Sequence, residues 1–135
     1  MKHFLLLIFV LISCCKDEEC ECKTEDNLDL YQTYWEGYFV KKDQGVENNV
    51  AIRIEFISTE TGEYFVEGSL LEDLYSKNSI FRYKLKDKII SIDEGYMNLL
   101  IGRWWIVKYE KDELLLRRDM IENNFIYELR LTKKI

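Results

Sequence analysis

The most reactive side chains of this sequence are concentrated near its beginning. Its cysteines are Cys14, Cys15, Cys20 and Cys22. Thiols form disulfides, bind metals or accept covalent modification. Cys20 and Cys22 have one residue between them, whereas zinc ligands are usually two to four residues apart, and no second ligand pair follows. We therefore expect no metal and no other cofactor, and in an oxidising compartment Cys15, Cys20 and Cys22 can pair with one another or between molecules.

A short hydrophobic leader precedes Cys14. Met1-Lys2-His3 supplies a basic start, residues 4–12 are apolar without interruption, and Ser13 stands directly before the cysteine. A helix that spans a bilayer needs roughly 20 apolar residues, so this run is too short to cross. The pattern predicts that residues 1–13 are a cleaved secretory signal peptide.

Leu11-Ile12-Ser13-Cys14 resembles the lipobox of bacterial lipoproteins. The resemblance implies that Cys14 becomes the first residue after cleavage and carries acyl chains such as palmitate. Two or more acyl chains anchor a protein stably, whereas one chain binds only marginally. We expect the membrane to be a partner through this N-terminal lipid anchor, without a membrane-spanning segment.

Residues 14–33 form an expected acidic tether. Lys16-Asp17-Glu18-Glu19 resembles the signal that exports some Gram-negative lipoproteins to the outer face of the outer membrane. Residues 14–27 are rich in charge and have no aromatic side chain, so they bury too little apolar surface to order themselves, and a solvated spacer explains the same residues. We predict an outer-membrane, lipid-anchored protein and leave open whether it is surface-exposed or periplasm-facing.

The mature chain lacks the side chains of most hydrolytic mechanisms. Its single histidine, His3, lies in the leader, so cleavage removes the imidazole that a Ser-His or Cys-His pair requires. Paired carboxylates remain available for glycosidase-type chemistry, but most acids fall in turns or at outward strand positions. We predict that the protein is not an enzyme and has no catalytic residues.

Charge limits the class of partner. Without residues 1–13 the chain has 18 Lys and Arg against 25 Asp and Glu, a net charge of −7. Binding to a phosphate backbone depends on Lys and Arg that release counterions, so this balance argues against nucleic acid. An acidic surface suits a basic protein partner.

From Tyr34 onward, short alternating segments rich in aromatic residues indicate antiparallel β-structure. In residues 50–56, Val50, Ile52, Ile54 and Phe56 share one face while Arg53 and Glu55 share the other. The expected strands are 35–41, 50–56, 64–68, 79–85, 89–93, 103–109, 113–118 and 125–131. Two segments interrupt the alternation of apolar and polar residues. We expect 29–34 to be a helical or extended lead-in and 70–78 to be a helical turn or lid.

About eight sequential strands with hairpin-length connections predict an all-β, up-and-down antiparallel barrel over residues 34–135. Closure removes the exposed strand edges that invite aggregation. A two-sheet sandwich is the alternative. An eight-stranded interior is either filled by side chains or holds one small ligand.

The order of the strand motifs resembles the lipocalin-like domains of small bacterial lipoproteins. The motifs are Trp35-Glu36-Gly37-Tyr38, Ile52 to Phe56, Gly62 to Tyr64, Tyr83 to Ile92, Trp104 to Ile106, Asp112 to Leu116 and Tyr127 to Leu131. The resemblance implies a lipocalin-like β-barrel. It transfers no catalytic residue, because one barrel hosts many activities.

Large apolar side chains are the candidates to line, or to fill, the interior. They are Phe56, Phe81, Tyr83, Trp104, Trp105 and Phe125. Neighbouring residues of a strand point to opposite faces, so one of Trp104 and Trp105 is expected in the core and the other outside. Arg103 is a candidate to cap the barrel end by a cation–π contact.

Two functions follow from this sequence. The first, which we favour, is a membrane-tethered, non-catalytic binding module for a small apolar ligand. The second is an acidic envelope protein that binds and inhibits a basic protein, such as a lysozyme-like enzyme or a toxin. A large interior cavity favours the first, and a solid core with an acidic or aromatic rim favours the second.

Overall fold

The computed structural model describes residues 28–68, 75–95, 97–120 and 124–135. The predicted signal peptide 1–13, the lipidation site Cys14 and residues 14–27 of the predicted tether lie outside these residues. Most of the predicted lid at 70–78 lies outside them as well.

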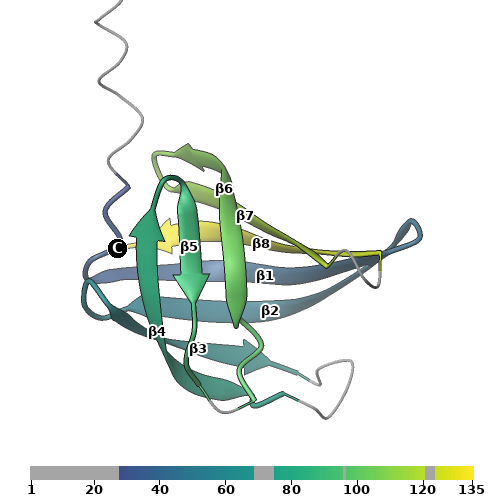
Figure 1. Ribbon diagram of the computed structural model, residues 1–135, viewed down its shortest axis with the longest axis horizontal. Helices are drawn as coiled ribbons and strands as arrows, with labels where there is room; N and C mark the ends of the chain where they lie inside the picture. Colours follow the sequence, from purple (N-terminus) through teal and green to yellow (C-terminus); the bar gives the residue numbers. More distant parts are fainter. Residues whose placement is uncertain (1–27, 69–74, 96, 121–123) are drawn as a thin grey trace, which may run out of the picture.

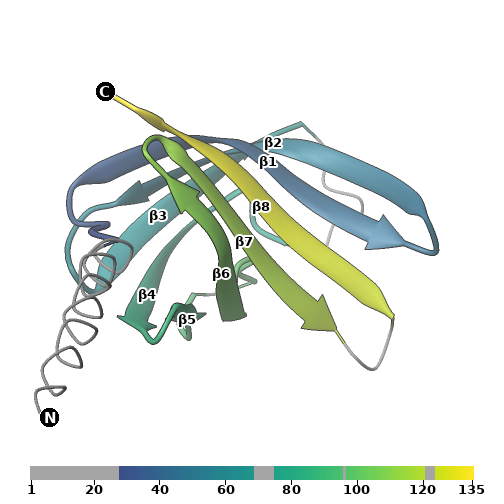
Figure 2. The same ribbon diagram turned by 90° about the horizontal axis from the view of Figure 1, so that it is seen from above.

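Eight antiparallel strands form one closed barrel (Figures 1 and 2). They are β1 (Thr33–Asp43), β2 (Val46–Phe56), β3 (Thr61–Glu67), β4 (Asn78–Lys86), β5 (Ile89–Ile92), β6 (Gly102–Glu110), β7 (Glu113–Met120) and β8 (Phe125–Lys134). Each strand pairs with the next in sequence, and β8 returns to pair with β1. The predicted eight-stranded up-and-down barrel is confirmed, and the sandwich is excluded because the first and last strands are joined.

Tight hairpins set the register of neighbouring strands. Gln44 and Gly45 have φ of 47° and 86°, and Asp87 and Lys88 have φ of 53° and 61°. Two successive residues with positive φ make a type I′ turn, whose twist matches that of the strands it connects. The first of these turns makes the β1–β2 hairpin longer than the sequence pattern predicts, and Figure 1 shows it projecting to the right of the barrel.

Strict alternation separates the core from the outer surface. In β3 the exposure alternates residue by residue, with Tyr64 and Val66 buried and Glu63, Phe65 and Glu67 exposed. The inward residues of all strands meet in one cluster that includes the fully buried Trp35, Trp104, Tyr64, Phe56 and Phe81. Burying such rings contributes about 1.5–3 kcal/mol each, so this cluster dominates the stability of the barrel.

Buried leucines close both ends of the barrel. At one end Leu30 is 2% exposed, and its carbonyl accepts a hydrogen bond from Thr33 Oγ1, which in turn accepts one from Trp35 Nε1. At the other end Leu100 is fully buried, and its carbonyl accepts a hydrogen bond of 2.7 Å from Trp104 Nε1. Each end is therefore held by the indole of a core tryptophan.

Leu30 packs in the core although it precedes the first strand. The acidic tether was expected to extend to residue 33, yet Leu30 and Thr33 are buried and β1 begins at Thr33. The alternation of apolar and polar residues starts only in β1, so it carries no signal for a plug that precedes the first strand.

Gly37 allows the barrel to close. It pairs with Leu131 of β8, and a Cβ atom placed on it would lie 1.8 Å from the backbone carbonyl oxygen of Arg130. Real atoms do not approach so closely, so any larger residue at position 37 pushes β8 away from β1.

We predict that Gly37→Ala lowers the free energy of unfolding by about 3 kcal/mol or more, because the obstruction is backbone that cannot rotate away. Urea denaturation measures this change. Gly68→Ala is the matched control: it stands in open space with φ of 98°, so only local strain of about 1 kcal/mol is expected. Equal losses in the two variants would contradict the closing role of Gly37.

Candidate functional site

The structure brings four of the six predicted lining residues together inside the barrel. Phe56, Phe81 and Tyr83 form a cluster of edge-to-face rings, with centroids 5.0 to 6.2 Å apart. Trp104 is fully buried and contacts Phe39 with a centroid distance of 6.3 Å. These side chains pack on one another in the buried core of the barrel.

The other two predicted lining residues lie elsewhere. Phe125 is only partly buried, and Lys41 Nζ lies 4.2 Å from the centre of its ring. Trp105 is 53% exposed on the outer surface and does not line the interior. The reason is the period of two in β6, which turns Trp105 outward when Trp104 points inward.

Buried tyrosine hydroxyls tie the filled interior to the connecting segments. Tyr83 donates a hydrogen bond of 2.7 Å to the carbonyl of Ser58, and burial raises the pKa of Tyr83 to about 12. Tyr64 donates to the carbonyl of Ser76 and accepts from the backbone N–H of Leu99. These phenols are satisfied by backbone groups, as buried polar side chains usually are.

Arg118 is the most buried cation at the end closed by Leu100. Its guanidinium lies 4.5 Å from the ring of Trp104 and 4.9 Å from that of Tyr127. It donates hydrogen bonds to the carbonyls of Ile101 and Leu99, and burial lowers its pKa. Arg118 therefore joins the 98–101 segment to the core.

Arg118 takes the role that the sequence assigned to Arg103. Arg103 neighbours Trp104 in the chain, and for that reason it points to the opposite face, where it is exposed. A cation that caps an inward tryptophan must come from an inward position of an adjacent strand. That position depends on the pairing of β6 with β7.

A hollow of about 640 Å³ lies at the end of the barrel closed by Leu30. Its apolar wall includes Leu28, Leu85, Ile106 and Tyr109. The charged part of its lining is Lys86, Asp87, Lys88, Lys108 and Glu110. This rim pocket lies at the mouth of the barrel, outside the ring cluster.

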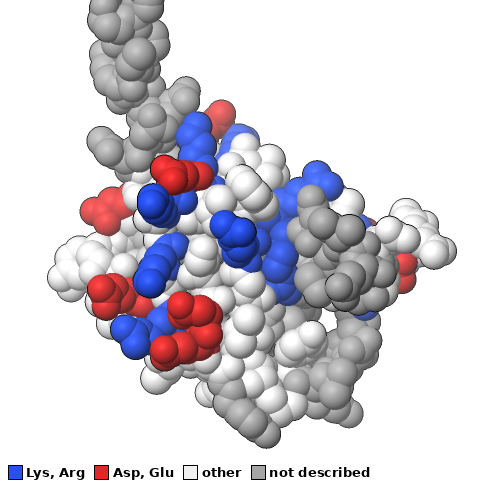
Figure 3. Space-filling view, in the orientation of Figure 1, with Lys and Arg blue, Asp and Glu red and all other residues white. Residues whose placement is uncertain are grey.

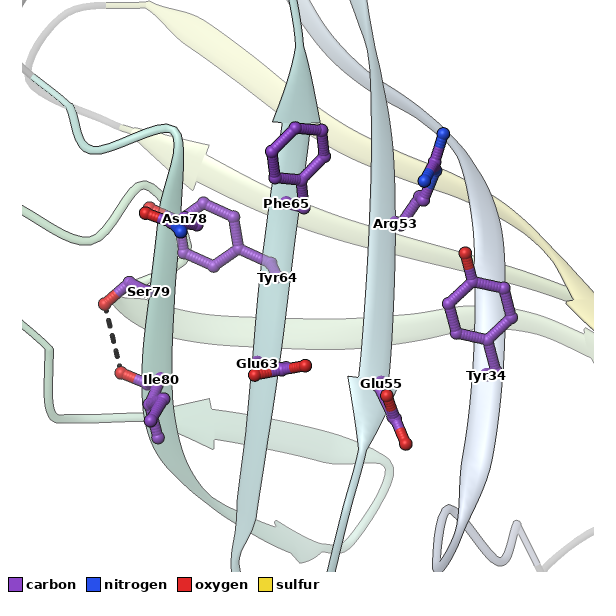
Figure 4. A pocket seen from close by; sticks show the side chains of 9 residues that line it. All are labelled: Tyr34, Arg53, Glu55, Glu63, Tyr64, Phe65, Asn78, Ser79 and Ile80. Carbon is purple, nitrogen blue, oxygen red and sulfur yellow. Dashed lines mark hydrogen bonds between the residues drawn. The ribbon is translucent and has the colours of Figure 1, made fainter.

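A second hollow, of about 540 Å³, lies on the outer face of β1 to β4 (Figure 4). One row of paired residues crosses it: Tyr34 of β1, Glu55 of β2, Glu63 of β3 and Ile80 of β4. Phe65 and Arg53 lie in the neighbouring row. We call the hollow formed by Tyr34, Glu55, Glu63, Phe65 and Ile80 the carboxylate groove.

Two like charges face each other in the carboxylate groove. Glu55 and Glu63 are directly opposite across β2 and β3, an arrangement that is destabilising for carboxylates. Within the described part of the chain, neither carboxylate has an ion-pair partner. The nearby Arg53 is instead held by Glu67 and Glu36 and lies over the ring of Phe65.

Apolar and aromatic side chains flank these carboxylates. Phe65 is 44% exposed and Ile80 is 66% exposed. Tyr34 donates a hydrogen bond of 3.0 Å to Glu36, and desolvation, that hydrogen bond and neighbouring carboxylates, including Glu55, raise its pKa. The groove combines negative charge with exposed rings, which is a surface that attracts organic cations.

Across residues 28–68, 75–95, 97–120 and 124–135, no three acidic, cysteine or histidine side chains gather as metal ligands. The same residues include no helix long and apolar enough to cross a membrane.

Comparison of the chain with family models, curated proteins and solved structures gave no match.

We predict that Arg118→Met lowers the free energy of unfolding by about 2 kcal/mol, because two carbonyls lose a charged donor. Thermal and urea unfolding measure the change. Arg103→Met is the control, since an exposed arginine on the outer face is worth less than about 0.5 kcal/mol. A more stable Arg118→Met variant would show that burying the guanidinium costs more than its contacts return.

Proposed function

We propose that this protein is a lipid-tethered, non-catalytic binding module of the cell envelope that captures a basic protein on its outer face. The observation that carries the proposal is the carboxylate groove. Glu55 and Glu63 repel each other there, and no side chain of the described residues neutralises them. A cation from a partner removes that repulsion on binding.

The groove suits an arginine or lysine side chain. Opposed residues of an antiparallel pair have Cβ atoms about 4.5–5.5 Å apart, so one guanidinium can reach both carboxylates. The ring of Tyr34 offers a face for its apolar stem and its charge, beside the ring of Phe65, which already has Arg53 over it. The filled interior supports the same choice, because the core rings leave the outer surface as the place for recognition.

Glu55→Gln combined with Glu63→Gln should weaken binding of a basic protein at least about tenfold. The affinity of this double variant should depend on salt concentration no more steeply than that of the parent chain. The same double variant should unfold with about 0.2–1 kcal/mol more free energy, because the facing charges are gone. Titration calorimetry with c-type lysozyme and with a short arginine-rich peptide measures the binding, and urea denaturation measures the stability.

Asp93→Asn combined with Asp112→Asn is the matched control. It removes the same charge from exposed positions away from the groove and should leave binding within about twofold of the parent chain. If both double variants bind equally well, attraction is due to net charge and the groove is not the site. If neither basic probe binds the parent chain, the proposed function is wrong.

A small amphipathic ligand is the second candidate, and the rim pocket favours it. Leu28, Leu85 and Ile106 form an apolar wall beside Lys86 and Lys88. An apolar tail with an anionic head matches that lining.

Native mass spectrometry of the purified chain tests this candidate. We expect the bare polypeptide mass, apart from any acyl group on Cys14. An additional mass that is lost on unfolding, and lost in a Leu85→Asp variant, would instead support the ligand carrier.

A further inference from the structure

The outer face of β4 to β7 carries cationic side chains, whereas the carboxylate groove carries anionic ones. Trp105, 53% exposed, stands between Ile89 of β5 and Arg117 of β7 in one row of paired residues. Arg103 pairs with Ser91 in the neighbouring row. We call this surface the tryptophan face; its residues are Lys84, Lys86, Ile89, Arg103, Trp105 and Arg117.

Cations surround the exposed indole. Lys84 and Lys86 are exposed on β4 and pair with Ser91 and Ile89 of β5. Neither these lysines nor Arg103 has an ion-pair partner among the described residues. In Figure 3, Lys and Arg side chains lie over β4 and around β6 with uncharged surface between the two groups, and Asp and Glu side chains lie beside those over β4.

Among the described residues, acidic side chains lie at the edges of the tryptophan face, where Glu128 of β8 pairs with Arg117. Asp87 lies in the turn between β4 and β5, and Asp93 and Glu94 follow the end of β5. Glu94 is paired with Arg82 at 3.4 Å. Residues 28–135 have sixteen Lys and Arg against nineteen Asp and Glu, so a cationic face is a local reversal of the overall charge.

This combination fits the surface of a bilayer that carries anionic headgroups. Tryptophan prefers the boundary between headgroups and acyl chains, where its ring is half apolar and half hydrated. Each Lys or Arg near such a surface strengthens attraction about fivefold. A basic protein is excluded by the sign of the charge.

We propose that the tryptophan face docks the barrel side-on against a membrane with anionic lipids. β6 is four strands from β2 in the closed order, so Trp105 lies across the barrel from Glu55, and the two surfaces meet only at β4. A barrel docked in this way keeps the groove toward solvent. The inference is independent of what the groove binds.

The test is quenching of Trp105 fluorescence by brominated acyl chains. The purified chain is mixed with vesicles of phosphatidylcholine alone or of phosphatidylcholine with phosphatidylglycerol. Trp35 and Trp104 are fully buried, so the difference between the parent chain and a Trp105→Phe variant isolates the exposed indole. We expect quenching with anionic vesicles at low salt, little with neutral vesicles, and its loss at high salt.

Lys84→Gln combined with Lys86→Gln should reduce the docked population relative to the undocked one about 30-fold. Lys77→Gln combined with Lys134→Gln removes two exposed cations elsewhere and should leave docking unchanged. Glu55→Gln with Glu63→Gln should also dock normally, which separates this inference from the function of the groove. Near-ultraviolet circular dichroism checks that each variant is folded.

Two results would overturn the proposal. Equal quenching in neutral and anionic vesicles would mean that the N-terminal segment alone brings the barrel to the bilayer. Binding of dextran sulfate that depends on Lys84 and Lys86, without quenching by anionic vesicles, would identify the partner as a soluble polyanion.

Discussion

The space enclosed by eight strands is the constraint on which this molecule depends. A barrel of that size holds either its own side chains or one small ligand. Here Trp35, Trp104 and Tyr64 lie in the enclosed space together with the rings of Phe56 and Phe81, and leucines close both ends. Close packing of these large rings stabilises the wall, and the outward half of every strand remains exposed to solvent.

The register between neighbouring strands determines which side chains meet on the two outer surfaces that we propose for binding. Glu55 meets Glu63 only because β2 and β3 pair in one particular alignment. Trp105 meets Arg117 and Ile89 for the same reason on the other wall. A shift of one residue would turn all of these side chains inward, so the packing of the core fixes the chemistry of the surface.

Much of the fold could be predicted from the sequence because alternation is a local property. The pattern of residues 50–56 alone predicts which side chains are buried and which are exposed, and the burial observed in β2 confirms this prediction. The closing pair of β1 and β8 followed from the need to protect strand edges.

The candidate site was harder to predict from the sequence than the fold, because its residues come from different strands. Nothing near Glu55 in the chain indicates that Glu63 will face it, and nothing near Trp104 indicates Arg118. Leu30 was also missed, since a plug residue outside a strand has no periodic partner. The turn at 57–60 sets the pairing of β2 with β3, and the turn at 111–112 sets that of β6 with β7, so these two connections are the signal that could have placed the strand residues.

The pairing of the first strand with the last also sets the order of events when the chain folds. Tyr34 pairs with Lys134, so the ends of the barrel wall come from opposite ends of the sequence. Contacts between such distant residues form slowly, because the whole intervening chain must first be brought together. A growing chain therefore has no complete barrel until its final strand is available. Closure of the barrel is therefore the last step of folding, and it completes only when the final residues of the chain are available.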